Sequence, residues 1–316
     1  MGRGPHGHVP GRAAALLTGP VPPPDPEPSA PPRRRLAPGF VATLAAGVLV
    51  VAFVVTRADD EPPPPPEPDR SEEEESGAAS AAATFTFEGT RYAFPTPAPE
   101  ADEPLGAPPA DVDPAASHVF TRTQEGTDDP VTWDPCRSLA VVVDDRMVPD
   151  GGARLLTEAL AQVARATGLR IDDEGSTDEA PAEHRDPVQQ ERYGDRWAPI
   201  LVAWSDPEAI PALAGAVGGQ GGNVAVRRDD ASPYAYVTGM LVLDGPQMQE
   251  SLQVRGGSDQ VRSVILHELA HVVGLGHVED PAELMYPEGQ PGVTVFGPGD
   301  RAGLARLGQG PCLPDL

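Results

Sequence analysis

The sequence predicts an α+β domain with a twisted, mixed five-stranded sheet and long helices over residues 117–316. Three observations lead to this fold class. Five short apolar segments have strand character, and two longer segments carry apolar residues at helical spacing. The first of these helices lies between two strands, an order that implies at least one right-handed parallel crossover, so a mixed sheet is expected.

The predicted strands are short, apolar and bounded by polar or turn-forming residues. They are residues 138–145, 169–175, 198–206, 223–228 and 236–245. The first helix is expected over residues 149–167, and Gly168 can end it in a left-handed conformation. The second is expected from Ser258, a good N-cap residue, through Val273. Its apolar residues lie nearly all round the helix, which is typical of a buried helix.

Three segments of distinct composition precede this domain. Residues 1–35 are proline-rich without apolar periodicity, which predicts a disordered tail. Residues 36–56 are uncharged and long enough to cross a hydrocarbon core of roughly 30 Å as a helix. Residues 57–116 combine a polyproline run with an acidic block and are expected to form a disordered stalk.

Three arginines, residues 33–35, directly precede the apolar run. By the positive-inside rule they keep the N-terminus in the cytoplasm, so a single-pass anchor at residues 36–56 would place the C-terminal domain outside the cell. The alternative is a cleaved signal peptide followed by secretion. The run is longer than a typical apolar h-region of roughly 7 to 15 residues, which favours the anchor.

Residues 84–94 interrupt the stalk with two alternating segments around Glu88 and Gly89, a pattern typical of a β-hairpin. Two interpretations remain open. The hairpin either packs on the main domain or acts as a proteolytic prosegment or inhibitory strand.

Charge and cysteine usage restrict the function further. The net charge is −25 and no lysine is present, and because an acidic surface repels nucleic acid, binding of DNA or RNA is not expected. The only two cysteines, Cys136 and Cys312, lie near the start and the end of the predicted domain. An extracellular location allows them to form a disulfide, which would stabilise the fold by roughly 4 to 5 kcal/mol in the chain-entropy model.

The segment HELAHVVGLGH, residues 267–277, has the spacing of a metal site. His267 and His271 are four residues apart on the expected helix, so their side chains lie on one face and can share one metal ion. Glu268 follows the first ligand, where its carboxylate can reach a water in the open position that catalytic zinc retains.

His277 lies six residues after His271, which in an unbroken helix means about 9 Å of rise and roughly 240° of rotation. The helix must therefore end between these two histidines. Gly274 can end it in a left-handed conformation, and Gly276 adds freedom for His277 to turn back toward the other two.

HELAHVVGLGH matches the HExxHxxGxxH signature of the metzincin zinc endopeptidases, and LMYP at residues 284–287 resembles their Met-turn in the form found in the matrixin branch. The resemblance implies a metzincin-like catalytic domain over residues 117–316, with the segment at residues 297–308 as its closing helix. The match is strong at residues 267–287 and weak elsewhere.

The resemblance implies that His267, His271 and His277 are the zinc ligands and that Glu268 is the general base. It also implies that Met285 forms the Met-turn and that Tyr286 and Pro287 form part of the wall of a substrate pocket. The implied reaction is hydrolysis of a peptide bond in a protein or peptide substrate. One zinc ion polarises the carbonyl and its water attacks, while Glu268 takes the proton and passes it to the leaving amine. In this family the substrate lies extended along an edge strand, for which residues 223–228 are the candidate.

The sequence departs from animal matrixins in two respects. It lacks the PRCGxPD-type motif of their prosegment, whose cysteine binds the zinc. Cys136 could serve as such a latency ligand instead, but an oxidising compartment favours a disulfide with Cys312. It also lacks their histidine-rich loop for a second, structural zinc. The acidic stretches IDDEGSTDEA and EHRDP offer ligands for Ca²⁺, although such stretches are usually solvated loops.

The function predicted is that of a membrane-anchored, extracellular zinc endopeptidase. The alternative from another class is a cell-surface binding or scaffolding protein with an idle zinc site, but the presence of Glu268 disfavours it. A purely structural metal is also disfavoured, because structural zinc sites usually have a fourth protein ligand.

Overall fold

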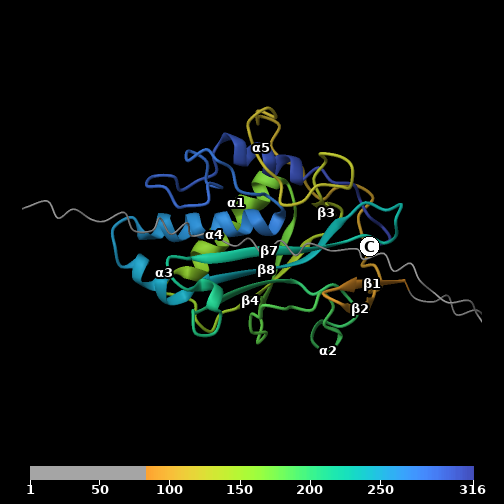
Figure 1. The fold of residues 1–316 in the computed structure, drawn as a ribbon, viewed down its shortest axis with the longest axis horizontal. Helices are drawn as coiled ribbons and strands as arrows, with labels where there is room; N and C mark the ends of the chain where they lie inside the picture. The colour runs from red at the N-terminus through yellow and green to blue at the C-terminus, as the bar shows by residue number, and fades with distance from the viewer. Residues whose placement is uncertain (1–82) are drawn as a thin grey trace, which may run out of the picture. The chain divides into compact units, whose positions relative to one another are not determined.

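The structure is a computed structural model that describes residues 83–316 (Figure 1). The predicted tail, the apolar run at residues 36–56 and the first part of the stalk lie outside these residues. Within residues 83–316, none of the helices combines the length and the apolar character needed to span a membrane.

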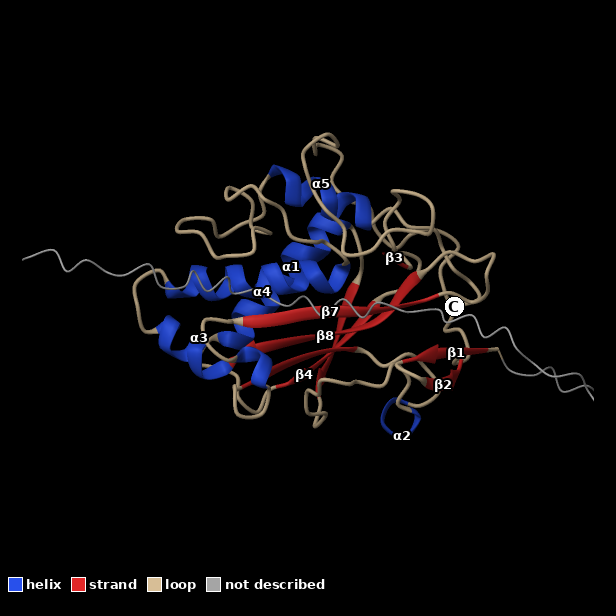
Figure 2. Ribbon diagram, viewed as in Figure 1, coloured by secondary structure: helices blue, strands red, loops and turns tan. Residues whose placement is uncertain are grey.

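A six-stranded mixed sheet forms the centre of the domain (Figure 2). Its main path runs through parallel neighbours in the order β3 (Thr132–Trp133), β8 (Ala235–Asp244), β6 (Ile200–Ser205), β4 (Leu139–Asp144) and β5 (Ile171–Ser176). The remaining strand, β7 (Gly219–Val226), pairs with β8 in the antiparallel direction. The prediction of a mixed sheet is thus confirmed, and parallel pairs dominate it.

The sheet has six strands rather than the five expected. The additional strand, β3, has only two residues, too few for the alternation that identifies a strand in a sequence. Strand β7 begins at Gly219, four residues before the predicted start, because glycine has low strand propensity and gives no signal there.

Helices α1 (Gly152–Thr167), α4 (Gly257–Val273) and α5 (Pro298–Leu307) lie together on one side of the sheet (Figure 1). The first of them connects the parallel strands β4 and β5, which confirms the expected crossover, and it ends at Gly168 with φ 76°. Helix α4 begins earlier than predicted. Its N-cap is Gly256, so Ser258 lies inside the first turn.

Two further helices and a 3-10 turn were not predicted: α2 (Gln190–Tyr193), α3 (Gly245–Leu252) and Pro211–Leu213. The main hydrophobic core fills the space between the helices and the sheet. It includes Leu155 from α1, Leu266 from α4 and Leu241 from β8, all essentially inaccessible to solvent. Full burial of each such side chain contributes roughly 1.5 to 3 kcal/mol.

The predicted hairpin is present and packs on the main domain. Strands β1 (Thr84–Phe87) and β2 (Thr90–Ala93) pair antiparallel, and the turn between them places Glu88 and Gly89 at φ 48° and 80°. Phe85 packs against Trp197, with ring centroids 5.2 Å apart. These aromatic rings belong to a small second core that includes Leu316 at the C-terminus.

Residues 95–116, which the sequence assigned to the disordered stalk, instead run along the domain. The amide N–H of Ala101 donates to the carbonyl oxygen of Cys136 at 3.0 Å, and that of Leu105 donates to Pro135 at 2.9 Å. The Arg137 guanidinium donates to the carbonyl oxygen of Ala98 at 3.0 Å. Composition alone did not reveal these contacts, because an extended proline-rich chain can still bond through its backbone groups.

Cys136 and Cys312 form the predicted disulfide, which joins positions 176 residues apart in the chain. Arg137, next to the disulfide, donates to the Asp134 carboxylate at 2.6 Å and to the carbonyl oxygen of Leu313 at 2.9 Å. The C-terminal segment is therefore fixed to the start of the domain by a covalent bond and by hydrogen bonds.

Candidate metal centre

The last turns of α4 carry the first two predicted ligands, His267 and His271. The helix ends directly after them. Gly274 adopts a left-handed conformation, φ 117°, and its N–H donates to the carbonyl oxygens of Ala270 and His271 at 3.0 Å each. The next amide, that of Leu275, donates to Ala270 at 2.8 Å. The chain therefore reverses between His271 and His277, as the spacing of these two residues requires if both are to bind one ion.

The chain that follows Gly274 is held by a segment from the start of the domain. The N–H of Thr121 donates to the Gly274 carbonyl oxygen at 2.9 Å, and the N–H of Gly276 donates to Val119 at 2.7 Å. A side chain at Gly276 would approach Val119 and the Phe120 backbone within 3.1 to 3.3 Å. The small size of Gly276 is therefore needed for the close approach of this segment. The φ angle of Gly276 is not positive, so backbone freedom is not the reason for a glycine here.

The three histidines converge. The Nε2 atom of His267 lies 3.2 Å from that of His271 and 3.1 Å from that of His277. The Nε2 atoms of His271 and His277 are 3.0 Å apart. Nitrogen ligands of a tetrahedral zinc ion lie about 3.3 Å from one another. The three predicted ligands therefore surround a single point at nearly the spacing that zinc requires.

The opposite ring nitrogens fix which nitrogen carries the proton. Nδ1 of His267 lies 2.8 Å from the carbonyl oxygen of Leu284, and Nδ1 of His271 lies 2.7 Å from that of Leu275. Because a carbonyl oxygen only accepts, each Nδ1 must be the donor, and Nε2 then presents a lone pair. The lone pairs of His267 and His271 face each other across 3.2 Å, an arrangement that a shared metal ion stabilises, so these residues fit a metal ion.

Burial keeps the three imidazoles neutral. It lowers the pKa of His267 to about 4, and it lowers that of His271 to about 3 with a further contribution from the other two histidines. The pKa of His277 is also lowered by burial. Neutral imidazole is the form that binds metals, so the site is in its binding form at neutral pH.

Glu268 lies against the backbone of strand β7. Burial raises the pKa of its carboxyl to about 7, although a hydrogen bond from the Gly221 backbone opposes this rise. A carboxyl group with this pKa exchanges protons near neutral pH, the property expected of a general base.

The predicted Met-turn contacts the histidine site through Leu284, whose carbonyl oxygen lies 2.8 Å from Nδ1 of His267. Met285 is fully buried, and its carbonyl oxygen accepts from the N–H of Val278 at 3.1 Å, directly after the third histidine. The neighbouring Tyr286 is partly exposed and Pro287 is exposed. The structure therefore places the two predicted pocket residues at the surface beside the site.

Two buried carboxylates that the sequence analysis did not single out hold this turn. Asp300, in the first turn of α5, accepts from the backbone N–H of Leu284 at 2.6 Å and of Met285 at 3.3 Å. Glu283 accepts from Gly299 at 2.9 Å and from Asp300 at 3.0 Å. In the sequence, only the acidic residue at the N-terminus of the closing helix could have suggested these contacts. The bonded residues are 15 to 17 positions apart, so no local pattern connects them.

The predicted substrate strand, residues 223–228, lies partly outside β7, which ends at Val226. Arg227 pairs with Glu125 at 3.0 Å, and Arg228 lies over the Phe94 ring at 5.0 Å. Only residues 223–226 of that prediction are therefore in the strand. Among the described strands, β7 pairs with β8 alone.

The acidic stretches suggested for Ca²⁺ do not form a cluster of ligands in the part of the chain that the structure describes. Four of their seven carboxylates pair with arginines instead: Asp172 with Arg170, Glu174 with Arg196, Asp178 with Arg192 and Glu179 with Arg185. Within residues 83–316, the only other group with metal-ligand spacing is Asp134 with the two cysteines, whose sulfurs are joined to each other.

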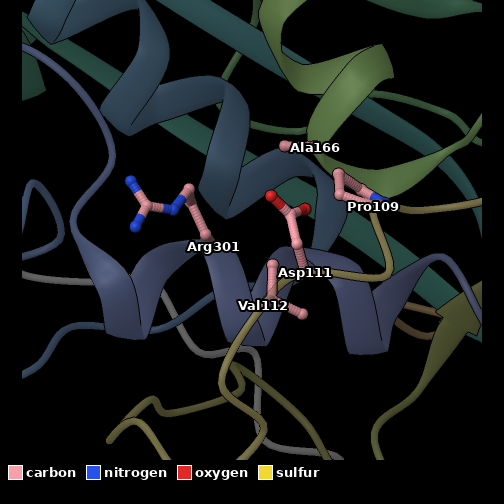
Figure 3. Close-up of a pocket in the computed structure, with 5 residues that line it drawn as sticks. All are labelled: Pro109, Asp111, Val112, Ala166 and Arg301. Atoms are coloured by element: carbon pink, nitrogen blue, oxygen red, sulfur yellow. The ribbon is translucent and has the colours of Figure 1, made fainter.

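A separate hollow of about 310 Å³ lies between α1 and α5 (Figure 3). Arg301 reaches it from α5 and Ala166 from the end of α1, while Pro109, Asp111 and Val112 line it from the passing loop. None of the histidines contributes to it.

Comparison with known proteins gives no family assignment. No family model and no curated protein matches the chain. One solved structure that matches is the GM1-bound form of the ECX AB5 holotoxin, with 14% identity and a TM-score of 0.24. The alignment covers 48% of this chain and 57% of that chain, so this chain spans just over half of the toxin chain. Likeness at this level supports no statement about fold or function.

Proposed function

We propose that this protein is a zinc-dependent endopeptidase that acts at the outer cell surface. The observation that carries the proposal is the convergence of His267, His271 and His277, whose Nε2 atoms lie 3.0 to 3.2 Å apart. The resemblance of residues 267–287 to the metzincins, and to their matrixin branch in particular, supports it further.

The proposed division of roles follows from the donor set. A zinc ion held by the three histidines would supply the Lewis acidity that polarises a peptide carbonyl and makes water nucleophilic at neutral pH. Glu268, one residue after the first ligand, would accept the proton of the attacking water and deliver it to the leaving amine. A pKa near 7 allows the carboxylate to do both.

The proposed substrate is an extended protein or peptide segment. Strand β7 pairs only with β8 among the described strands, which leaves one edge available for backbone hydrogen bonds to such a segment. Tyr286 and Pro287, at the surface after the buried Met285, would form a wall of the pocket for the residue after the scissile bond.

The proposed location is outside the cytoplasm. The disulfide between Cys136 and Cys312 is typical of oxidising compartments. The apolar run at residues 36–56, preceded by three arginines, would anchor the chain in the membrane with its N-terminus in the cytoplasm. Secretion after cleavage of that run is the alternative.

The test compares the full-length protein with two variants, Glu268→Gln and Glu279→Gln. The second is a matched control, because Glu279 is an exposed glutamate close to the third histidine. Bound zinc is measured by elemental analysis, and cleavage of an unfolded protein is followed by mass spectrometry. All three proteins should bind one zinc ion, and only Glu268→Gln should lose cleavage.

The control variant should cleave at nearly the wild-type rate. Equal cleavage by the wild type and Glu268→Gln would overturn the proposed mechanism. A wild-type protein that binds zinc but cleaves no unfolded substrate would instead support the idle binding protein, and absence of zinc from the wild type would remove the basis of both.

A further inference from the structure

On the face of strand β7 that meets the metal-binding helix, two successive positions are glycine and the third is asparagine. Gly219, Gly221 and Asn223 alternate along this strand and all contact α4. A Cβ atom at Gly219 would lie 3.0 Å from Cγ of Glu268. A Cβ atom at Gly221 would overlap the backbone carbonyl oxygen of Glu268, so the strand approaches the helix as closely as glycine permits.

The third residue of this face, Asn223, bonds to the end of the helix. Its Nδ2 atom donates to the carbonyl oxygen of His271 at 2.9 Å and to that of Val272 at 3.2 Å. Because both partners are carbonyl oxygens, only the amide nitrogen of Asn223 can face them. The last carbonyl groups of a helix have no partner within it, and here the side chain of the edge strand provides one.

We propose that Gly219, Gly221 and Asn223 are positioning residues of the histidine site. Gly221 sets the distance between β7 and the helical turn that carries His267 and His271. Asn223 fixes the end of that turn, from which the chain reverses toward His277. This inference rests on the proposed metal site, but it does not require peptide cleavage.

The neighbouring Gly222 provides a matched control. It lies in the same strand, is exposed, and has no heavy atom within 4 Å of the position that a Cβ would take. Alanine therefore has the same intrinsic effect on the strand at positions 221 and 222, and differs only in its contact with the backbone of Glu268.

Zinc dissociation constants of the full-length wild type, Gly221→Ala, Gly222→Ala and Asn223→Ala test the proposal, with the melting temperature of each metal-free protein measured in parallel. Zinc affinity should fall about 10- to 100-fold in Gly221→Ala and Asn223→Ala, as it does when groups that orient metal ligands are removed. Gly222→Ala should stay within about threefold of the wild type. The visible spectrum of the Co²⁺ form should change only in the first two variants.

Two further outcomes keep a general loss of stability apart from a positioning role. Gly221→Ala and Asn223→Ala that melt earlier but bind zinc as tightly as Gly222→Ala would overturn the proposal. Asn223→Asp keeps the shape of the side chain but directs a carboxylate at two carbonyl oxygens, so it should bind zinc more weakly than Asn223→Ala. Wild-type affinity in Asn223→Asp would mean that Asn223 only fills space.

Asn223→Ala should fold, because each carbonyl group keeps a second donor. The Gly274 N–H donates to His271 at 3.0 Å, and the indole of Trp133 donates to Val272 at 3.2 Å. This variant therefore decides the question if Gly221→Ala does not fold. Because the comparison concerns relative zinc affinity, a protein that binds zinc without cleaving peptides would refute the proposed function and leave this inference testable.

Discussion

Nδ1 of His267 donates a hydrogen bond of 2.8 Å to the carbonyl oxygen of Leu284, and this contact joins α4 to the predicted Met-turn. The Leu284 peptide is itself held from its other side, because its N–H donates to Asp300 at 2.6 Å. A single peptide group therefore links the first predicted ligand to a carboxylate in the closing helix.

Replacement of Asp300 should weaken zinc binding although Asp300 touches no metal. Asparagine has the same shape, but its amide group turns one acceptor into a donor, which must face either the N–H of Met285 or those of Leu284 and Gly297. We expect Asp300→Asn to lower zinc affinity about tenfold and the free energy of unfolding by about 1 to 3 kcal/mol. Zinc titration and urea denaturation measure the two effects.

Asp280→Asn is the control for this prediction, since Asp280 is exposed and accepts from the N–H of Ala282 at 2.9 Å within the same loop. It should change neither quantity appreciably. Equal zinc affinity in Asp300→Asn and Asp280→Asn would show that Asp300 does not orient His267.

Zinc binding should depend little on pH in the mildly acidic range. Only neutral imidazole binds the ion, and a lowered pKa keeps that form present until the pH falls through the lowered value. Burial places the pKa of His267 at about 4 and that of His271 at about 3, and it lowers that of His277. The dissociation constant should therefore change less than about tenfold between pH 7.5 and 5.5.

A synthetic peptide of residues 263–280 provides the comparison, because its imidazoles titrate near the ordinary pKa of about 6.5. Its zinc affinity should fall by about tenfold for each histidine at pH 5.5. If the affinity of the protein fell in parallel with that of the peptide, the histidines would not be protected by burial.

Gly274→Ala should damage the metal site through the helix ending. At φ 117° an L-residue is strained, and a Cβ atom would lie 2.8 Å from the ring of Tyr236 and 3.0 Å from Leu307. The strain should cost about 1 to 2 kcal/mol, and displacement of the turn should lower zinc affinity about tenfold or more. Isothermal titration of the metal-free protein measures this.

Gly292→Ala separates backbone strain from position. Gly292 also has a positive φ, 85°, but no heavy atom lies within 4 Å of its Cβ position. This variant should lose stability to a similar extent and retain zinc affinity. A similar loss of affinity in both variants would exclude a specific role of the turn at Gly274.

Arg185→Met should destabilise the fold far more than Arg192→Met. Arg185 is almost inaccessible and forms two hydrogen bonds with the buried Glu179, at 2.8 and 2.9 Å. Burial raises the pKa of Glu179, but hydrogen bonds from Arg185 and Tyr193 outweigh it, so the pKa lies below its usual value. Loss of Arg185 would leave that charge buried without its partner and should cost about 3 to 5 kcal/mol.

The pair of Arg192 with Asp178 is largely exposed, so Arg192→Met should cost less than about 1 kcal/mol. Thermal denaturation of the two variants provides the comparison. Similar melting temperatures would mean that the pair of Arg185 and Glu179 does not stabilise the loop that carries it.

Local spacing in the sequence determined much of this protein. Apolar periodicity predicted α1, α4 and most of the strands, because a helix or strand repeats its buried face within a few residues. The spacing of His267, His271 and His277, with a glycine at position 274 to end the helix, predicted that the three side chains converge. This prediction too depended only on residues close together in the sequence. The strand Thr132–Trp133 and the start of β7 gave no such repeat and were missed.

Contacts between distant segments were decided only by the tertiary structure. The hydrogen bond of His267 to Leu284 spans 17 residues, and the contact of Asn223 with His271 spans 48. Residues 95–116 have the composition of a linker, but their backbone groups bond to the domain and the segment runs along it. Backbone carbonyl and amide groups are the same at every position, so a sequence does not reveal which of them will meet, and only the packed fold assigns these partners.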